Sequence, residues 1–200
     1  TLSEGERFTM LDFGQSLTLD VILAAVFGFT EDAERDGFAK VVAEYMETLH
    51  PSFMFAAVLQ HPLWPPWRRF CAAREAYESM IRKKIDELRP QAAEREDILS
   101  MMLVAEFDDG TKMNERELIE QLNTLLIAGH ETTAITMAWA VYWLFRNPVS
   151  LARTREEIET LGPNPGPETY TKLPYLDAVI RESLRIRPIV TEALRTLTGP

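Results

Sequence analysis

The sequence LLIAGHETT at residues 125–133 decides the fold, because it lies at the centre of a long, proline-free helical pattern. The pattern covers residues 114–146, and Asn114 at its start is a good helix N-cap. Asn147 and Pro148 end it. A helix of this length measures about 48 Å, enough to cross a whole domain. Apolar residues recur along it at helical spacing, namely Leu118, Leu122, Leu125, Leu126, Trp139, Trp143 and Leu144.

Four residues at the centre of this predicted helix are unusual for a purely structural helix. Gly129 costs about 1 kcal/mol relative to alanine. Thr132 and Thr133 are β-branched and can hydrogen-bond to the preceding turn, while Glu131 brings a charge into a section expected to be buried. Such departures at the centre of an otherwise regular element indicate a functional site. The alternative is a buried helix with a polar kink.

Length and composition indicate a globular chain. Its 200 residues, 46% of them hydrophobic, can bury a core, and a net charge of −10 argues against a nucleic-acid partner. The single cysteine, Cys71, excludes an internal disulfide and fits a reducing compartment, so a cytoplasmic location is expected. No apolar run reaches the roughly 18 residues of a membrane span, so a membrane partner is not expected. Because the chain begins with Thr1 and stops at Pro200 without a polar tail, it is predicted to be a fragment, and an upstream anchor could have been lost.

The rest of the chain predicts further helices and one irregular apolar segment. Residues 51–67 are broken by four prolines and rich in aromatic residues, which fits either a lid over a pocket or a short helix and turn packed on the core. Residues 162–167 form a loop by composition, and residues 189–197 could be a strand. Helices are predicted over residues 10–29, 30–50, 68–89, 97–106, 148–161 and 175–186. Gly28 is a reasonable C-terminal stop for the first of them.

Two segments carry a resemblance to a known family. Residues 128–133, AGHETT, resemble the distal-helix motif of cytochromes P450, and residues 173–188 resemble the K-helix of the same family. Within the second segment, Glu182 and Arg185 lie three residues apart on one helical face. Arg195 follows at the place where bacterial members of the family have an arginine that binds a haem propionate.

The resemblance implies a mainly α chain with a partial cytochrome P450 fold, built on a long central distal helix and a Glu-x-x-Arg helix. Residues 1–200 would then form a single partial domain. The implied activity of the complete protein is that of a haem-thiolate monooxygenase, which inserts one oxygen atom from dioxygen into a small apolar organic substrate. The implied cofactor is haem b, with electrons from NAD(P)H delivered through a ferredoxin or flavin reductase.

The resemblance also assigns roles to individual residues of the distal helix. Ala128 and Gly129 would bring the helix close to the haem, and Thr133 belongs to the same cofactor-binding set. The Thr132 hydroxyl would hydrogen-bond dioxygen and direct protons to it. Glu131 would help to carry those protons from solvent.

The second motif has a structural role by resemblance, and the metal ligand has no counterpart. Glu182 and Arg185 would form a buried structural core lock, so replacing either residue should destabilise the fold. The family's thiolate ligand lies in a glycine-containing loop that this sequence lacks. Cys71 stands far upstream and is interpreted as a packed helix cysteine, so no metal ligand is predicted in this chain. The fragment alone is therefore expected to be inactive.

Other functions were weighed against this interpretation. A zinc-protease helix would need a second histidine three residues after Glu131, and that position is Ala134. A non-catalytic all-α domain that binds a small ligand is the main alternative. A purely structural helical module explains the amphipathic helices but not the central residues of the long helix. The preference for an apolar substrate rests on the aromatic lid candidates, which could equally belong to the core: Phe53, Phe55, Trp64 and Trp67.

Overall fold

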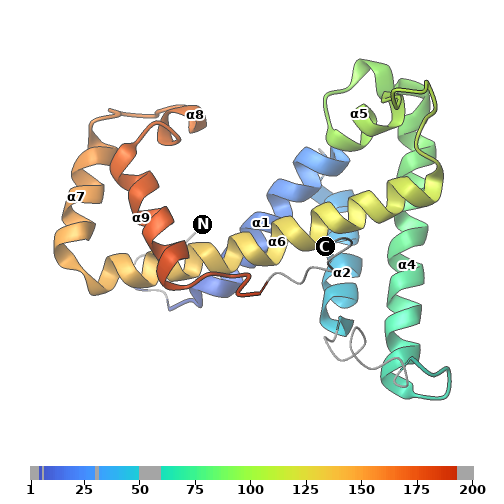
Figure 1. The fold of residues 1–200 in the computed structure, drawn as a ribbon, viewed down its shortest axis with the longest axis horizontal. Coiled ribbons are helices and arrows are strands. Elements are labelled where there is room, and N and C mark those ends of the chain that lie inside the picture. The colour runs from blue at the N-terminus through green and yellow to red at the C-terminus, as the bar shows by residue number, and fades with distance from the viewer. Residues whose placement is uncertain (1–4, 6, 30–31, 50–59, 193–200) are drawn as a thin grey trace, which may run out of the picture. The chain divides into compact units, whose positions relative to one another are not determined.

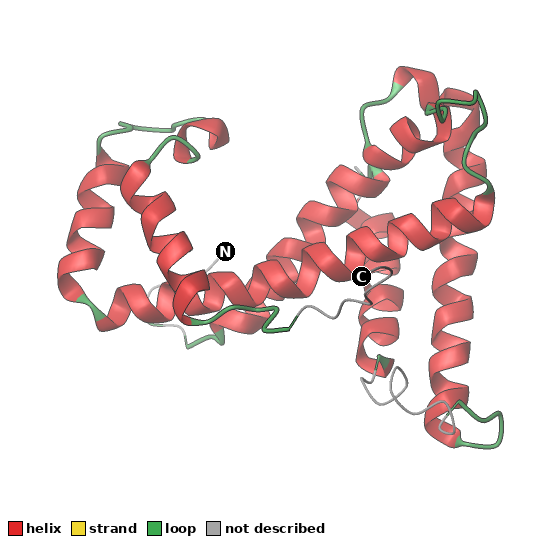
Figure 2. Ribbon diagram, viewed as in Figure 1, coloured by secondary structure: helices red, strands yellow, loops and turns green. Residues whose placement is uncertain are grey.

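The computed structural model describes residues 5, 7–29, 32–49 and 60–192 (Figure 1). Every regular element in these residues is helical, which confirms the predicted fold class (Figure 2). The chain divides into two compact units, here called the 17–130 unit and the 131–200 unit, and the second also includes residues 1–16. Because α1 and α6 run through both units, the single partial domain stays a prediction. The elements are α1 (Met10–Phe27), α2 (Asp32–Thr48), α4 (Pro65–Leu88), η2 (Arg89–Glu94), α5 (Ile98–Val104), α6 (Glu115–Arg146), α7 (Pro148–Glu159), α8 (Pro167–Tyr170) and α9 (Pro174–Ile186).

Helix α6 is the predicted long helix and has 32 residues. The Asn114 side chain accepts a hydrogen bond of 3.0 Å from the Glu117 N–H, and the Glu117 carboxylate accepts one of 2.8 Å from the Asn114 N–H. This reciprocal capping box satisfies two backbone donors and confirms the predicted helix start. Beyond the other end, the Asn147 side chain accepts a hydrogen bond of 3.1 Å from the Ser150 N–H and caps α7.

The core of the 17–130 unit is rich in aromatic residues. The Phe38 ring of α2 lies 4.9 Å from the Phe27 ring and 5.1 Å from the Phe29 ring, measured between ring centroids. Tyr45 of α2 stacks on Tyr77 of α4 at 4.8 Å with an interplanar angle of 9°. All five side chains are buried. Since burying one such side chain contributes about 1.5–3 kcal/mol, this cluster holds α1, α2 and α4 together.

A polar connection in the same unit joins the end of α1 to the start of α5. Gly28 ends α1 with a φ of 65°, a conformation that favours glycine, and its carbonyl accepts a hydrogen bond of 3.2 Å from Arg95 Nη2. Arg95 Nε lies 2.6 Å from Asp97 Oδ2. The other oxygen of Asp97 accepts a hydrogen bond of 2.9 Å from the Ser100 N–H and caps α5. The predicted stop at Gly28 is therefore confirmed.

In the 131–200 unit, α7 provides the cap for α9. Leu173, at the N-cap position of α9, makes no side-chain capping hydrogen bond. Instead the Glu157 carboxylate accepts hydrogen bonds of 2.8 Å from the backbone N–H groups of both Tyr175 and Leu176. The Arg153 guanidinium lies 4.5 Å from the centre of the Tyr175 ring. These contacts fix the start of α9, the helix that carries the Glu-x-x-Arg motif.

Three local features differ from the sequence-based expectations. Residues 189–192 do not form a strand, and the rest of the predicted strand lies outside the described residues. The predicted loop at residues 162–167 is observed through residue 166, and the short helix α8, which was not predicted, begins at Pro167. Cys71 lies on α4 as predicted, but its side chain is exposed rather than packed. The buried face of α4 is marked by Ala73 and Tyr77, and Cys71 points away from it because of the helical spacing.

The lid prediction falls largely on residues that the structure does not describe. Phe53 and Phe55 lie outside the described residues. Trp64 immediately precedes α4 and Trp67 lies in its first turn, and both are half-buried. The Trp67 ring lies 5.1 Å from the Phe70 ring, within the packing of α4. The choice between a lid and a core segment stays open.

Helix α1 is long and apolar enough to cross a membrane, judged by its length and composition alone. The core helix of a globular protein and an N-terminal signal sequence can have the same length and composition, so these properties do not distinguish the three. Leu23 and Phe27 of α1 are fully buried in the core. The expectation that the chain has no membrane partner stays a prediction.

Candidate functional site

The segment at residues 125–133 lies in the middle of α6, and its side chains divide between an open face and a packed face. Leu125, Ala128 and Thr132 share the open face because they are spaced by three and four residues. Leu125 is 38% exposed, Ala128 is exposed and Thr132 is half-buried. The packed face consists of residues that are less than a tenth exposed, namely Leu126, His130 and Ala134.

Glu131 is held by a residue from the start of the chain. Gln15 Nε2 of α1 donates a hydrogen bond of 2.8 Å to Glu131 Oε1, across 116 positions of sequence. The carboxylate is half-buried. Because an amide is neutral, this bond orients the carboxylate without cancelling its charge. The bond from Gln15 therefore sets the direction of the Glu131 carboxylate.

His130 is held from α1 in a similar way. Its Nδ1 lies 2.9 Å from the Thr18 hydroxyl, which is also 3.3 Å from the His130 carbonyl oxygen. Both side chains are buried. A buried imidazole needs such partners, because a polar group without one costs about 1–3 kcal/mol. His130 is thus a packing residue of the motif.

Two glycines allow α1 and α6 to approach each other closely. A Cβ atom added to Gly129 would lie 3.2 Å from Ile22 Cδ1 of α1. A Cβ atom added to Gly14 of α1 would lie 3.2 Å from the Ala134 carbonyl oxygen of α6. Both distances are tighter than ordinary van der Waals contacts. The glycine in the motif therefore has a packing reason within this chain, in addition to its predicted role at the haem, which stays a prediction.

The two threonines of the motif occupy different positions on α6. Thr132 is half-buried on the open face, whereas Thr133 is exposed. The Thr132 carbonyl accepts a hydrogen bond of 2.7 Å from the Thr136 hydroxyl one turn later. A side-chain hydroxyl that hydrogen-bonds to the carbonyl one turn earlier often bends a helix, so this bond affects the backbone geometry at Thr132.

The Glu-x-x-Arg pair forms, but its surroundings differ from those expected. Arg185 Nε and Nη2 each lie 2.7 Å from an oxygen of Glu182, in a two-pronged arrangement. The hydrogen bond from Arg185 lowers the pKa of Glu182, and the same bond raises the pKa of Arg185. The side chains are 54% and 71% exposed, so the pair is not buried within this chain. Its role as a structural core lock stays a prediction, and Arg195 lies outside the described residues.

The described residues do not assemble a metal centre of their own. Within the described ranges, no group of three or more His, Cys, Asp and Glu side chains could hold a metal ion. Cys71 is exposed on α4, and the expectation that it is not the thiolate ligand stays a prediction. The site residues that the structure brings together are the consecutive residues of α6 and their partners on α1.

Gln15 and Thr18 are the residues that sequence reasoning missed. They lie more than a hundred positions before their partners, and hydrogen bonds over such distances leave no local pattern. The sequence does carry a weak signal for these two partners. Gln15 and Thr18 are polar residues three positions apart, so they lie on one face of an otherwise apolar helix.

Comparisons with known proteins all point to one family. The family model described as "Cytochrome P450" matches residues 1–199. "Putative cytochrome P450 135B1" of Mycobacterium tuberculosis is 36% identical over 189 residues, covering 91% of this chain and 38% of that protein. "Putative cytochrome P450 138" of the same species is 34% identical, covering 98% and 43%. Among solved structures, the haem domain of cytochrome P450DA has a TM-score of 0.77 and 26% identity, covering 92% of this chain and 41% of that one.

Proposed function

Because this chain belongs to the cytochrome P450 family, we propose that the complete protein is a haem-thiolate monooxygenase that inserts one oxygen atom from dioxygen into a small apolar substrate. The chain spans about two-fifths of the length of the curated relatives it matches. The activity is therefore proposed for the complete protein. The alternative of a non-catalytic ligand-binding domain is not favoured, because both curated relatives are named as cytochromes P450.

The open face of α6 fits one side of a flat, apolar prosthetic group. Ala128 is small and exposed, and Leu125 adds an apolar side chain one turn before it. Haem b, when bound there, supplies the electron-transfer and dioxygen chemistry that no amino-acid side chain provides. Of the cofactor-binding set implied by the resemblance, Ala128 stands on this face, whereas Gly129 packs against Ile22 of α1 and Thr133 occupies a different position on α6.

Thr132 and Glu131 would position and deliver protons at this face. The observation that carries the proposal is that Thr132 stands on the open face directly after a carboxylate that Gln15 holds at 2.8 Å. The Thr132 hydroxyl can both donate and accept a hydrogen bond, which suits it to pass a proton to dioxygen. Glu131 can exchange protons with solvent, because it is only half-buried.

The remaining parts of the proposed site do not belong to the central motif of α6, and Arg195 lies outside the described residues. Arg195 would bind a haem propionate. Glu182 with Arg185 would support the haem-binding core once another part of the complete protein covers this pair. The thiolate ligand is proposed to come from a part of the complete protein other than residues 1–200, because Cys71 is exposed on a helix that carries none of the motif. Electrons would come from NAD(P)H through a ferredoxin or flavin reductase. The proposed location is the cytoplasm.

The experiment that tests the proposal is the Thr132→Ala substitution in the complete protein. We expect the variant to consume dioxygen and release peroxide, with about tenfold less hydroxylated product per dioxygen consumed. The reason is that one proton-transfer group accelerates a reaction by about 10²–10⁴-fold, and water takes over part of that role in the variant. The substrate is an apolar compound chosen by its perturbation of the haem spectrum. Thr171→Ala is the matched control, since Thr171 is exposed and bonds only to its own turn. Unchanged coupling in Thr132→Ala would refute the role of Thr132.

A further inference from the structure

The last part of α6 carries an aromatic cluster to which the proposed function gives no role. The Trp139 ring lies 5.5 Å from the Tyr142 ring and 6.4 Å from the Trp143 ring, measured between centroids. The Tyr142 and Trp143 rings lie 5.1 Å apart. Indole and phenol rings lose a single electron far more readily than aliphatic side chains. Rings in such contact can pass an electron from one to the next, because electron tunnelling weakens steeply with distance.

The two tryptophans continue the open face of α6 beyond Thr132. Trp139 follows Thr132 by seven residues, so it lies about 10.5 Å further along the helix axis and within about 20° of the same face. Trp143 stands one turn later on the same side, four residues after Trp139. Both tryptophans are half-buried. The cluster therefore leads away from the face where haem is proposed to bind, along one stripe of the helix.

The surroundings of Trp143 keep the proton on an oxidised indole. Its Nε1 atom is fully buried and makes no hydrogen bond within the described part of the chain. An indole ring that has lost one electron is a strong acid, but water does not reach this N–H and no acceptor among the described residues contacts it. The oxidised ring therefore stays a cation. Such a cation regains an electron without waiting for a proton.

Tyr142 gives the cluster an outlet to solvent. The residue is 44% exposed, so water can take the phenol proton when the ring loses an electron. The product is a neutral phenoxyl radical. The Arg146 guanidinium lies 5.5 Å from the centre of the Tyr142 ring. Arg187 lies 5.0 Å from the centre of the Trp139 ring. A nearby positive charge disfavours a ring cation but not a neutral radical, so both arginines favour the phenoxyl radical as the end product.

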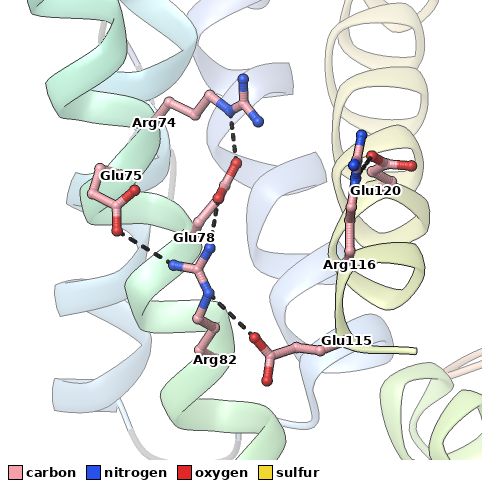
Figure 3. A network of polar contacts seen from close by, with 7 residues as sticks. All are labelled: Arg74, Glu75, Glu78, Arg82, Glu115, Arg116 and Glu120. Carbon is pink, nitrogen blue, oxygen red and sulfur yellow. Dashed lines mark hydrogen bonds and ion pairs between the residues drawn. The ribbon is translucent and has the colours of Figure 1, made fainter. Parts of the chain in front are cut away.

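The stacked pair of Tyr45 and Tyr77 in the 17–130 unit lacks such an outlet. Burial raises the pKa of both phenols, and Tyr77 is only 1% exposed, so solvent does not take its proton. The Glu78 carboxylate, which lines the same cavity of about 240 Å³, is already engaged. Figure 3 shows it between Arg74 at 2.6 Å and Arg82 at 2.8 Å. Contact between rings is therefore not enough for electron transfer to the surface, since one ring must also release its proton.

We propose that Trp139, Trp143 and Tyr142 form a relay that carries a surplus oxidising equivalent from the open face of α6 to solvent. This relay rests on the proposed function, which supplies an oxidant from dioxygen at the haem when no substrate takes it up. One electron moves from Tyr142 through the tryptophans to that oxidant, which is reduced by one electron, and the phenol proton moves to water. The phenoxyl radical on Tyr142 regains one electron and one proton from a reductant in solution, such as a thiol.

The first test oxidises the aromatic residues without using the haem. Azide radicals, generated by pulse radiolysis in a solution of the complete protein, take one electron from indole rings and become azide ions. We expect the absorbance of the indole radical to decay while that of the phenoxyl radical grows, at a rate independent of protein concentration. The phenoxyl yield should fall in Tyr142→Phe. It should stay unchanged in the control Tyr170→Phe, because Tyr170 is an exposed tyrosine outside the cluster.

The second test joins the cluster to the haem. The haem-loaded complete protein is treated with hydrogen peroxide and a nitroso spin trap in the absence of substrate, and trap adducts are located by peptide mass spectrometry. We expect an adduct on Tyr142. Trp139→Phe introduces a ring that is much harder to oxidise, so this adduct should be lost although Tyr142 is retained. Trp67→Phe is the control, since Trp67 lies in the first turn of α4 and outside the cluster.

The two tests separate a failure of the relay from a failure of the proposed function. Equal phenoxyl yields in Tyr142→Phe and Tyr170→Phe would overturn the relay, whether or not the complete protein binds haem. An adduct on Tyr142 that persists in Trp139→Phe would overturn the path through the tryptophans. Absence of any adduct on Tyr142 in the haem-loaded protein would overturn the link between the cluster and the open face of α6.

Discussion

Gln15 Nε2 on α1 donates a hydrogen bond of 2.8 Å to Glu131 Oε1 on α6, and this bond sets the direction of the one carboxylate in the central motif. We predict that Gln15→Leu in the complete enzyme lowers the yield of product per dioxygen about fivefold, because an unheld carboxylate samples several rotamers. The measurement compares product formed with dioxygen consumed. Gln91→Leu is the control, since Gln91 is exposed on η2. Equal coupling in Gln15→Leu would show that Glu131 needs no orientation from α1.

Thr18→Val tests the packing role of His130. The substitution keeps the shape of the side chain and removes the hydroxyl that bonds His130 Nδ1 at 2.9 Å and its carbonyl at 3.3 Å. The free energy of unfolding should fall by about 1–2 kcal/mol, because a buried imidazole loses its partner. Urea unfolding followed by circular dichroism measures it. Thr171→Val, at an exposed threonine, should change it by much less. An equal effect of the two would argue against a packing role for His130.

Asp97 predicts a defined pH dependence. Burial alone would raise the pKa of its carboxyl, but hydrogen bonds from Ser100 and the ion pair with Arg95 outweigh burial and hold this pKa below its ordinary value. A group with a lowered pKa in the folded state stabilises the fold above its unfolded pKa, and that contribution is lost as the pH falls through the folded pKa. Asp97→Asn should therefore cost about 1 kcal/mol at neutral pH and progressively less below about pH 4.

The measurement is urea unfolding of the wild type and Asp97→Asn across that pH range. The control is Asp86→Asn, since Asp86 lies exposed on α4. A difference between Asp97→Asn and the wild type that stays constant as the pH falls would contradict the assignment of the effect to the charge.

Glu157→Gln tests the cap that α7 provides for α9. Its carboxylate receives the N–H groups of Tyr175 and Leu176, both at 2.8 Å, at the positive end of the α9 dipole. Glutamine keeps the size and one acceptor but removes the charge, so stability should fall by about 0.5–1 kcal/mol. Thermal unfolding measures it, with the exposed neighbour Glu156→Gln as the control. If both variants melt alike, the cap does not depend on charge.

Tyr77→Phe and Tyr45→Phe are predicted to have opposite effects on the stability of the 17–130 unit. Tyr77→Phe should be about 1 kcal/mol more stable, because it removes a buried hydroxyl that has no partner within the described residues. Tyr45→Phe should be less stable than the wild type, since Asn123 hydrogen-bonds the Tyr45 side chain. Chemical unfolding of the two variants checks the contrast. A loss of stability in Tyr77→Phe would mean that its hydroxyl has a partner in the folded protein.

Sequence reasoning succeeded where structure depends on nearby residues. The start of α6 follows from Asn114 and Glu117, three positions apart, and their reciprocal cap is a local interaction. The end of α1 follows from Gly28, whose positive φ is a property of that residue. Sequence reasoning failed at Cys71, because the exposure of its side chain depends on which face of α4 packs against other helices.

The sequence by itself determined the longer helices, the local cap at Asn114 and the two motifs, since helical periodicity and local capping act over at most four residues. The cap that Glu157 provides for α9 was not among them, because it joins residues 18 and 19 positions apart. Those motifs were also enough to identify the family. Only the tertiary structure decided which side chains meet. The Gln15–Glu131 and Thr18–His130 pairs join positions more than a hundred residues apart. The cavity bounded by Tyr45, Tyr77 and Asn123 draws on three helices, so it exists only once those helices pack.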